Sequence, residues 1–96
     1  GPTPKEGQKV AVHYAGYLLA DGNPFGNSYQ RGTPIEITIG EEGIIEGWQK
    51  GLPSLPEGSQ ALIFIPSELA YGEAGRPPQI PPDADLVFFI EVLNVG

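Results

Sequence analysis

The sequence predicts an α+β domain in which an antiparallel sheet packs one short helix against one face. Several segments alternate apolar and polar residues or are continuously apolar, as strands are. Only the segment IIEGWQKGL repeats apolar residues at helical spacing. With 96 residues, of which 14 are glycine and 11 are proline, the chain is expected to form a single turn-rich domain over residues 1–96.

The strands are expected in the segments KVAVHY, PIEITIG, SQALIFIP and DLVFFIEVL, at residues 9–14, 34–40, 59–66 and 85–93. The side chains expected to face the core are Val10, Val12 and Tyr14 in the first strand, Ile35, Ile37 and Ile39 in the second, and Leu86, Phe88, Ile90 and Val92 in the last. Asp21-Gly22, which follows the first strand, is a strong hairpin signal. The third strand is almost continuously apolar, which favours a central position in the sheet.

The expected helix covers residues 44–52 and is short. Its apolar face is expected to consist of Ile44, Trp48 and Leu52. Gly47 and Gly51 weaken the helix, and Pro53 is expected to end it. A helix of this length must take its stability from packing on the sheet.

Composition argues against several classes of partner and chemistry. The net charge is −7, whereas nucleic acids and anionic membranes attract basic proteins, so neither is expected as a partner. The chain has no cysteine and one histidine, His13, which argues against disulfides, thiolate chemistry and a metal site of the usual ligand count. No apolar run is long enough to span a bilayer, so a soluble, cytoplasmic protein is the default expectation. A targeting segment removed from before Gly1 would leave no trace in this sequence.

Aromatic residues stand where the expected strands meet loops. They are Tyr14, Phe25, Trp48, Tyr71 and Phe88. Motifs for nucleotide phosphates, nucleophilic serine and EF-hand calcium binding are missing, so these aromatics are the best candidates for a site. Each one could be an ordinary core residue, but the set could also line an apolar pocket with hydroxyl groups at its rim.

Three stretches resemble the FKBP-type peptidyl-prolyl cis-trans isomerases, the immunophilins that bind tacrolimus and rapamycin. The stretches are VAVHYAGYLLADGNPF, PIEITIGEEGIIEGWQKGL and LIFIPSELAYGEAGRPPQIPPDADLVFFIEVL, and the resemblance runs from about Lys5 to Val95. It implies a strongly curved antiparallel sheet wrapped around the helix, and isomerisation of X-Pro bonds in peptides and unfolded chains. It also implies that no cofactor or metal is needed, and we expect a monomer.

The resemblance further implies a pocket for the proline ring. Trp48 corresponds to its floor, and the implied walls are Tyr14, Phe25, Phe88, Ile35, Ile44, Ile45 and Ile80. The backbone N–H of Ile45 and the hydroxyl of Tyr71 are implied to hydrogen-bond the carbonyls of the ligand. The stretch AYGEAGRPPQIPPDAD, which begins just before Tyr71, would then be a flap that brings Ile80 to the pocket edge.

The clearest departure from the family pattern is Gly26, in the run FGNS, where relatives usually have an aspartate. In relatives this carboxylate points into the pocket wall. Its loss either weakens catalysis and macrolide binding, or only removes a tuning group from a pocket that still works. We expect partial activity. The alternative is a non-catalytic module that binds proline peptides or macrolides.

Smaller departures lie in one expected pocket wall, in the flap and at the start of the chain. Ile35 stands where many relatives have phenylalanine, and Arg76 and Gln79 replace more apolar or neutral residues of some relatives. Arg76 could favour acidic sequences around the proline, although a solvated loop charge is the simpler interpretation. The extra N-terminal strand segment of longer members is missing, which is expected to leave a sheet edge exposed.

Overall fold

The computed structural model describes residues 3–40 and 44–95. In these residues the strands are β1 (Lys9–Leu18), β2 (Pro24–Asn27), β3 (Ile35–Thr38), β4 (Gln60–Ile65) and β5 (Leu86–Val95), and the α-helix is α1 (Glu46–Gly51). Short 3₁₀ turns follow β2, α1 and β4: η1 (Tyr29–Arg31), η2 (Leu52–Ser54) and η3 (Ser67–Leu69). The predicted α+β class is confirmed.

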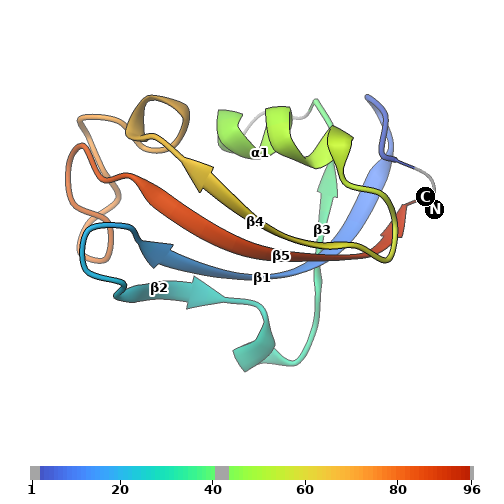
Figure 1. Ribbon diagram of the computed structural model, residues 1–96, viewed down its shortest axis with the longest axis horizontal. Coiled ribbons are helices and arrows are strands. Elements are labelled where there is room, and N and C mark those ends of the chain that lie inside the picture. Colours follow the sequence, from blue (N-terminus) through green and yellow to red (C-terminus); the bar gives the residue numbers. More distant parts are fainter. Residues whose placement is uncertain (1–2, 41–43, 96) are drawn as a thin grey trace.

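Strand β1 connects the parts of the sheet. It pairs with β2 and β3 along one edge and with β5 along the other, and β4 lies beyond β5 (Figure 1). Every pair is antiparallel. The two longest strands, β1 and β5, therefore lie side by side in the middle of the sheet although they come from opposite ends of the chain.

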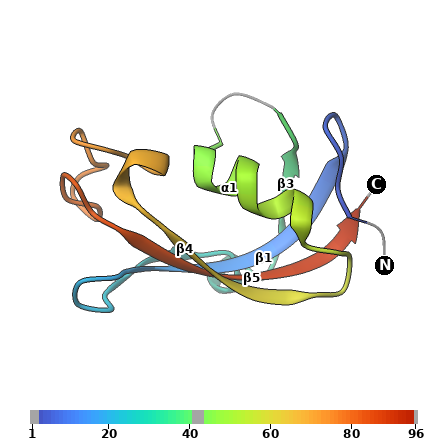
Figure 2. The ribbon, with the colours of Figure 1, turned by 45° about the horizontal axis from the view of Figure 1, so that its top comes forward.

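The sheet curves around α1, which lies on its concave face (Figure 2). Two irregularities in the pairing of β1 with its neighbours accompany this curvature. The register of β1 shifts against β5 between Ala11 and Val12, and against β2 between Gly16 and Tyr17. An extra residue at such a shift bends a strand and increases its twist, which is how a sheet of few strands can wrap a helix.

The concave face carries the hydrophobic core. All side chains predicted to point inward from the strands belong to this core or pack against it. Val12, Leu86 and Ile90 are completely buried, and Leu52 reaches them from the helical side. The period-two pattern thus assigned the inner faces of β1, β3 and β5 correctly.

The predicted helix is present but shorter than expected. Ile45 has an extended backbone (φ −60°, ψ 146°) and caps the helix, so α1 begins at Glu46. The α-helix ends at Gly51, and Pro53 lies in the 3₁₀ turn η2 that continues it. In the described part of the chain, no helix has the length and apolarity needed to cross a bilayer.

The helix packs very closely on the sheet because Gly47 faces β4. A Cβ atom at Gly47 would lie 2.5 Å from Cγ2 of Ile65, closer than side-chain atoms can approach. The glycine weakens the isolated helix but permits the contact that stabilises it in the fold. Trp48 and Leu52, which follow on the same apolar face, are buried, as predicted.

The central position predicted for the third strand is wrong. That strand is β4, and within the described residues it has a partner on one side only, β5. Leu62 and Phe64 point away from the helix and are each 62% exposed. A continuous apolar run does not distinguish a strand buried on both faces from an edge strand with an apolar outer face. Strand β2 was not predicted, because its four residues are too few to show alternation.

Candidate active site

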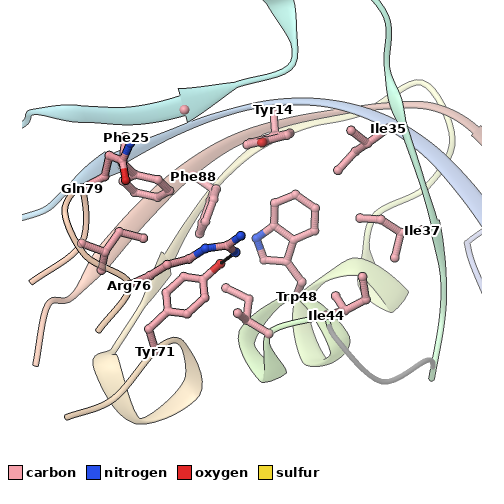
Figure 3. A pocket seen from close by; sticks show the side chains of 13 residues that line it. Tyr14, Phe25, Ile35, Ile37, Ile44, Trp48, Tyr71, Arg76, Gln79 and Phe88 are labelled. Atoms are coloured by element: carbon pink, nitrogen blue, oxygen red, sulfur yellow. Dashed lines mark hydrogen bonds between the residues drawn. The ribbon is translucent and has the colours of Figure 1, made fainter. Parts of the chain in front are cut away.

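A pocket of about 390 Å³ opens between α1, the concave face of the sheet and the loop before β5 (Figure 3). All residues assigned to the site from the resemblance line it: Tyr14, Phe25, Gly26, Ile35, Ile44, Ile45, Trp48, Tyr71, Ile80 and Phe88. The lining also includes Ile37, Arg76 and Gln79. Its volume lies within the usual range for small-ligand sites, about 300–1,000 Å³.

Trp48 and the aromatic side chains around it form the floor and one wall. The ring of Trp48 meets those of Tyr14 and Phe88 edge to face, at centroid distances of 5.4 and 5.1 Å. Phe25 meets Phe88 in the same manner at 5.4 Å. Edge-to-face contacts place the positive edge of one ring on the negative face of the next, and they fix the rings relative to one another. The apolar surface is therefore preformed.

A bulge in the β1–β2 hairpin brings Phe25 and Gly26 to the same pocket. Gly16 pairs with Gly26 but Tyr17 pairs with Pro24, so Phe25 is the extra residue of β2. In a regular strand two successive residues would point to opposite faces, and the bulge relieves this constraint. The hairpin itself, predicted from Asp21-Gly22, is confirmed.

Glycine at position 16 makes the aromatic wall possible. A Cβ atom there would lie 2.4 Å from Cζ of Phe25 and 2.9 Å from Cε1 of Phe88. The opposite glycine is different, since a Cβ atom at Gly26 would meet nothing within 4 Å. The pocket wall at Gly26 therefore has room for a side chain that the sequence does not supply.

Two N–H donors of the pocket have no acceptor among the described residues. Within residues 3–40 and 44–95, no hydrogen bond is formed by the backbone N–H of Ile45 or by Nε1 of Trp48. The indole nitrogen is buried and lies on the side of the ring that faces Phe88 and Tyr71 (Figure 3). A buried donor without an acceptor costs free energy, and a bound carbonyl would remove that cost.

The loop between η3 and β5 forms the flap expected from the resemblance. Arg76 and Ile80 exchange two backbone hydrogen bonds, at N–O distances of 2.8 and 3.0 Å, which closes the loop tip into a small hairpin. Gly75 has a φ of 63°, and a Cβ atom there would lie 2.6 Å from the carbonyl oxygen of Ile80. This tight hairpin directs the side chain of Ile80 towards the pocket, where only 3% of the residue is exposed.

The polar groups of the lining are few. Nη1 of Arg76 lies 3.5 Å from the hydroxyl oxygen of Tyr71, and Cζ lies 5.8 Å from the centroid of its ring. The titratable residues of the lining are Tyr14, Tyr71 and Arg76, and none of its described residues is a carboxylate or a histidine. No cluster of potential metal ligands occurs in the described residues either. The pocket can bind an apolar ring and donate hydrogen bonds, and its described residues include no carboxylate or imidazole that could act as a general base.

Outside the pocket, His13 and Tyr29 belong to a structural network on the outer face of the sheet. Nδ1 of His13 lies 2.8 Å from Oγ of Ser28, and its ring stacks on that of Tyr29 at 4.5 Å. Desolvation raises the pKa of Tyr29, and the hydrogen bond from its hydroxyl to Glu91 adds to this effect. The network ties Ser28 and η1 to β1 and β5, and none of its members lines the pocket.

Ile37 was expected in the core and Arg76 and Gln79 in the flap, so their position in the pocket lining was not predicted. One signal was present, because Arg76 lies between Tyr71 and Ile80, which were both assigned to the site. Only closure of the flap, however, brings its side chain over the pocket.

The fold, the aromatic floor and the flap define a class of protein. The sequence model of the family described as FKBP-type peptidyl-prolyl cis-trans isomerase matches residues 1–93. The chain therefore belongs to this family of enzymes.

Individual relatives agree with this assignment. The chain is 48% identical to the peptidyl-prolyl cis-trans isomerase FPR2 of Saccharomyces cerevisiae over 89 residues, which is 93% of the chain and 66% of the yeast protein. It is 47% identical to FK506-binding protein 1 of Debaryomyces hansenii, covering 97% of the chain and 82% of that protein. The crystal structure of FkpA from Escherichia coli superposes with a TM-score of 0.88 at 45% identity, over 99% of this chain and 43% of the FkpA chain. The curved fold around one helix, implied by the resemblance, is thus confirmed.

Proposed function

We propose that residues 1–96 form one isomerase domain that accelerates cis–trans exchange at X-Pro bonds of peptides and unfolded chains. The observation that carries the proposal is the preformed apolar pocket floored by Trp48, with unpaired N–H donors beside it. The proline ring would lie against Trp48 and Phe88. The Ile45 N–H and the Tyr71 hydroxyl would donate to substrate carbonyls.

The proposed mechanism is binding that favours the twisted peptide bond. Rotation about a peptide bond is opposed by about 18–20 kcal/mol of resonance energy, and X-Pro bonds exchange over roughly tens to hundreds of seconds without help. Twisting localises the nitrogen lone pair and reduces the charge separation of the amide. An apolar pocket therefore stabilises the twisted amide relative to the planar one, which is differential binding of the transition state.

This mechanism needs no proton transfer, cofactor or metal. It is compatible with a lining whose described residues include no carboxylate and no histidine. The names of the relatives, a peptidyl-prolyl cis-trans isomerase and an FK506-binding protein, support both the reaction and the macrolide FK506 (tacrolimus) as a pocket ligand.

Gly26 supports a reduced activity as part of the same proposal. A carboxylate at this position would enter the pocket wall, and the unoccupied space around Gly26 could accommodate it. Its absence removes a hydrogen-bond acceptor for ligand hydroxyls and for the hydroxyls of the lining. The competing function is a module that binds proline peptides in the pocket without accelerating their exchange.

Exchange spectroscopy by NMR on Ala-X-Pro-Phe peptides distinguishes the two functions. We expect the unaltered protein to accelerate exchange, and the Gly26→Asp variant to do so faster. Peptides that bind without faster exchange would identify a binding module. Exchange that appears only with Gly26→Asp would show that the carboxylate is required.

A further inference from the structure

We propose that Arg76 makes the pocket select peptides in which an acidic residue immediately precedes the proline. This inference rests on the proposed function, because it assigns a substrate preference to the same pocket. It starts from a cation at the rim of an apolar site that the described residues leave without a counter-ion.

The guanidinium of Arg76 has no acidic partner in the described part of the chain. The ion pairs there join Lys9 to Glu36 and Lys50 to Glu46, both at the surface. The contact of Arg76 is with the Tyr71 hydroxyl, at 3.5 Å. Four of the five guanidinium N–H donors of an arginine therefore remain for a ligand or for water.

The pocket lining does not neutralise this charge. Among the described residues of the lining Arg76 alone is charged, and Gly26, next to Phe25 of the aromatic wall, has no side chain. The net charge of −7 arises from acids elsewhere on the surface, such as Glu73 and Asp83, which are exposed and do not line the pocket. Salt weakens the effect of surface charges more than about 8 Å away at physiological ionic strength, whereas a ligand carboxylate at the rim would meet the guanidinium directly.

The contact with Tyr71 indicates which residue of the substrate meets Arg76. A guanidinium can only donate, so the Tyr71 oxygen accepts from Arg76 and the hydroxyl proton stays free for a substrate carbonyl. If that carbonyl belongs to the residue before the proline, one hydroxyl group separates it from the guanidinium. An Asp or Glu side chain on the same residue then reaches Nη1, and its carboxylate suits the planar fork of arginine.

The view into the pocket agrees with this placement. The side chains of Tyr71 and Arg76 lie together on the side of Trp48 away from Ile35 and Ile37 (Figure 3). The substrate residue before the proline would thus lie at the rim beside a cation, whereas the other side of the pocket, at Ile35 and Ile37, offers only apolar surface.

The test compares kcat/KM for Ala-Glu-Pro-Phe and Ala-Gln-Pro-Phe, which differ by one charge at nearly constant shape. We expect the unaltered protein to favour the Glu peptide about two- to fivefold, as for an exposed ion pair. The preference should decline in 0.5 M NaCl, which screens the pair. Arg76→Gln is expected to bring the ratio close to one.

Arg31→Gln is the matched control. It removes the same charge from an exposed arginine that lies in η1, outside the pocket lining. We expect this variant to keep the preference for the Glu peptide. Loss of the preference in both variants would mean that overall charge produces it, and a ratio of one in the unaltered protein would contradict the proposal directly.

Binding separates failure of this inference from failure of the proposed function. If no peptide is isomerised but peptides bind, the fluorescence of Trp48, the single tryptophan, gives the two dissociation constants. Tighter binding of the Glu peptide that requires Arg76 would support the inference although the protein is not an isomerase. Equal dissociation constants, or no binding of either peptide, would overturn it.

Discussion

Alanine at Gly16 should damage the pocket, whereas alanine at Gly26 should not. The two glycines face each other across the β1–β2 pair, so the same substitution tests the two sides of one bulge. Neither has a positive φ, so backbone strain does not separate them. The difference lies in what the new methyl group meets.

At Gly16 the added Cβ atom would lie 2.4 Å from Phe25 and 2.9 Å from Phe88, whereas ordinary contact begins at 3.4 Å. Both rings must move, and Phe88, which packs against Phe25, is one of the rings that contact Trp48. Overpacking of this kind costs about 1–3 kcal/mol. For a domain of this size each kcal/mol lowers Tm by about 4–8 °C.

At Gly26 the methyl group would enter open space. Alanine there is expected to leave stability unchanged or to raise it by about 0.4–1 kcal/mol, because it restricts the unfolded chain. Thermal unfolding followed by Trp48 fluorescence gives Tm for both variants, and titration with a proline peptide gives affinity. Equal Tm values and equal peptide affinity for the two variants would refute the conclusion that the rings of the aromatic wall require glycine at position 16.

The other predictions concern the floor, the rim, the helix and the outer network. Trp48→Ala should lower peptide or tacrolimus affinity about tenfold or more through lost apolar contact, measured by calorimetry; unchanged affinity would place the pocket elsewhere. Tyr71→Phe should lower the affinity for carbonyl-bearing ligands by about two- to tenfold at unchanged Tm. Equal affinity would show that the hydroxyl does not hydrogen-bond the ligand. Gly47→Ala should lower Tm in spite of alanine's helix propensity, because the facing isoleucine of β4 leaves no room; a higher Tm would contradict this packing. Desolvation is the main cause of the raised pKa of Tyr29, which favours the neutral phenol in the folded state. The stability that this shift contributes is therefore fully present below pH 10, the usual pKa of tyrosine, and is lost as the pH rises through the folded-state pKa. Urea unfolding between pH 9 and 11 should show that Tyr29→Phe loses less stability with rising pH than the unaltered protein does. Identical pH profiles for the two proteins would contradict a contribution from Tyr29.

Much of the fold follows from local patterns. The inner faces of β1, β3 and β5 could be assigned because side chains alternate along a strand whatever its partner is. The Asp21-Gly22 turn and the apolar face of α1 depend on backbone preferences within a few residues, so they could be predicted in the same way. The site residues were reached through the resemblance of longer motifs to a family, since aromatics alone fit an ordinary core equally well.

Tertiary structure decided the features that depend on pairing between distant segments. The edge position of β4 results from strand order, to which an apolar run gives no clue. The register shift that adds Phe25 to β2, and with it the open space at Gly26, depends on how two strands meet. Arg76 joined the pocket because its backbone pairs with Ile80 and closes the flap over Trp48. Periodicity reports the environment of one segment, whereas a pocket is made where several segments come together, and only the folded chain brings them there.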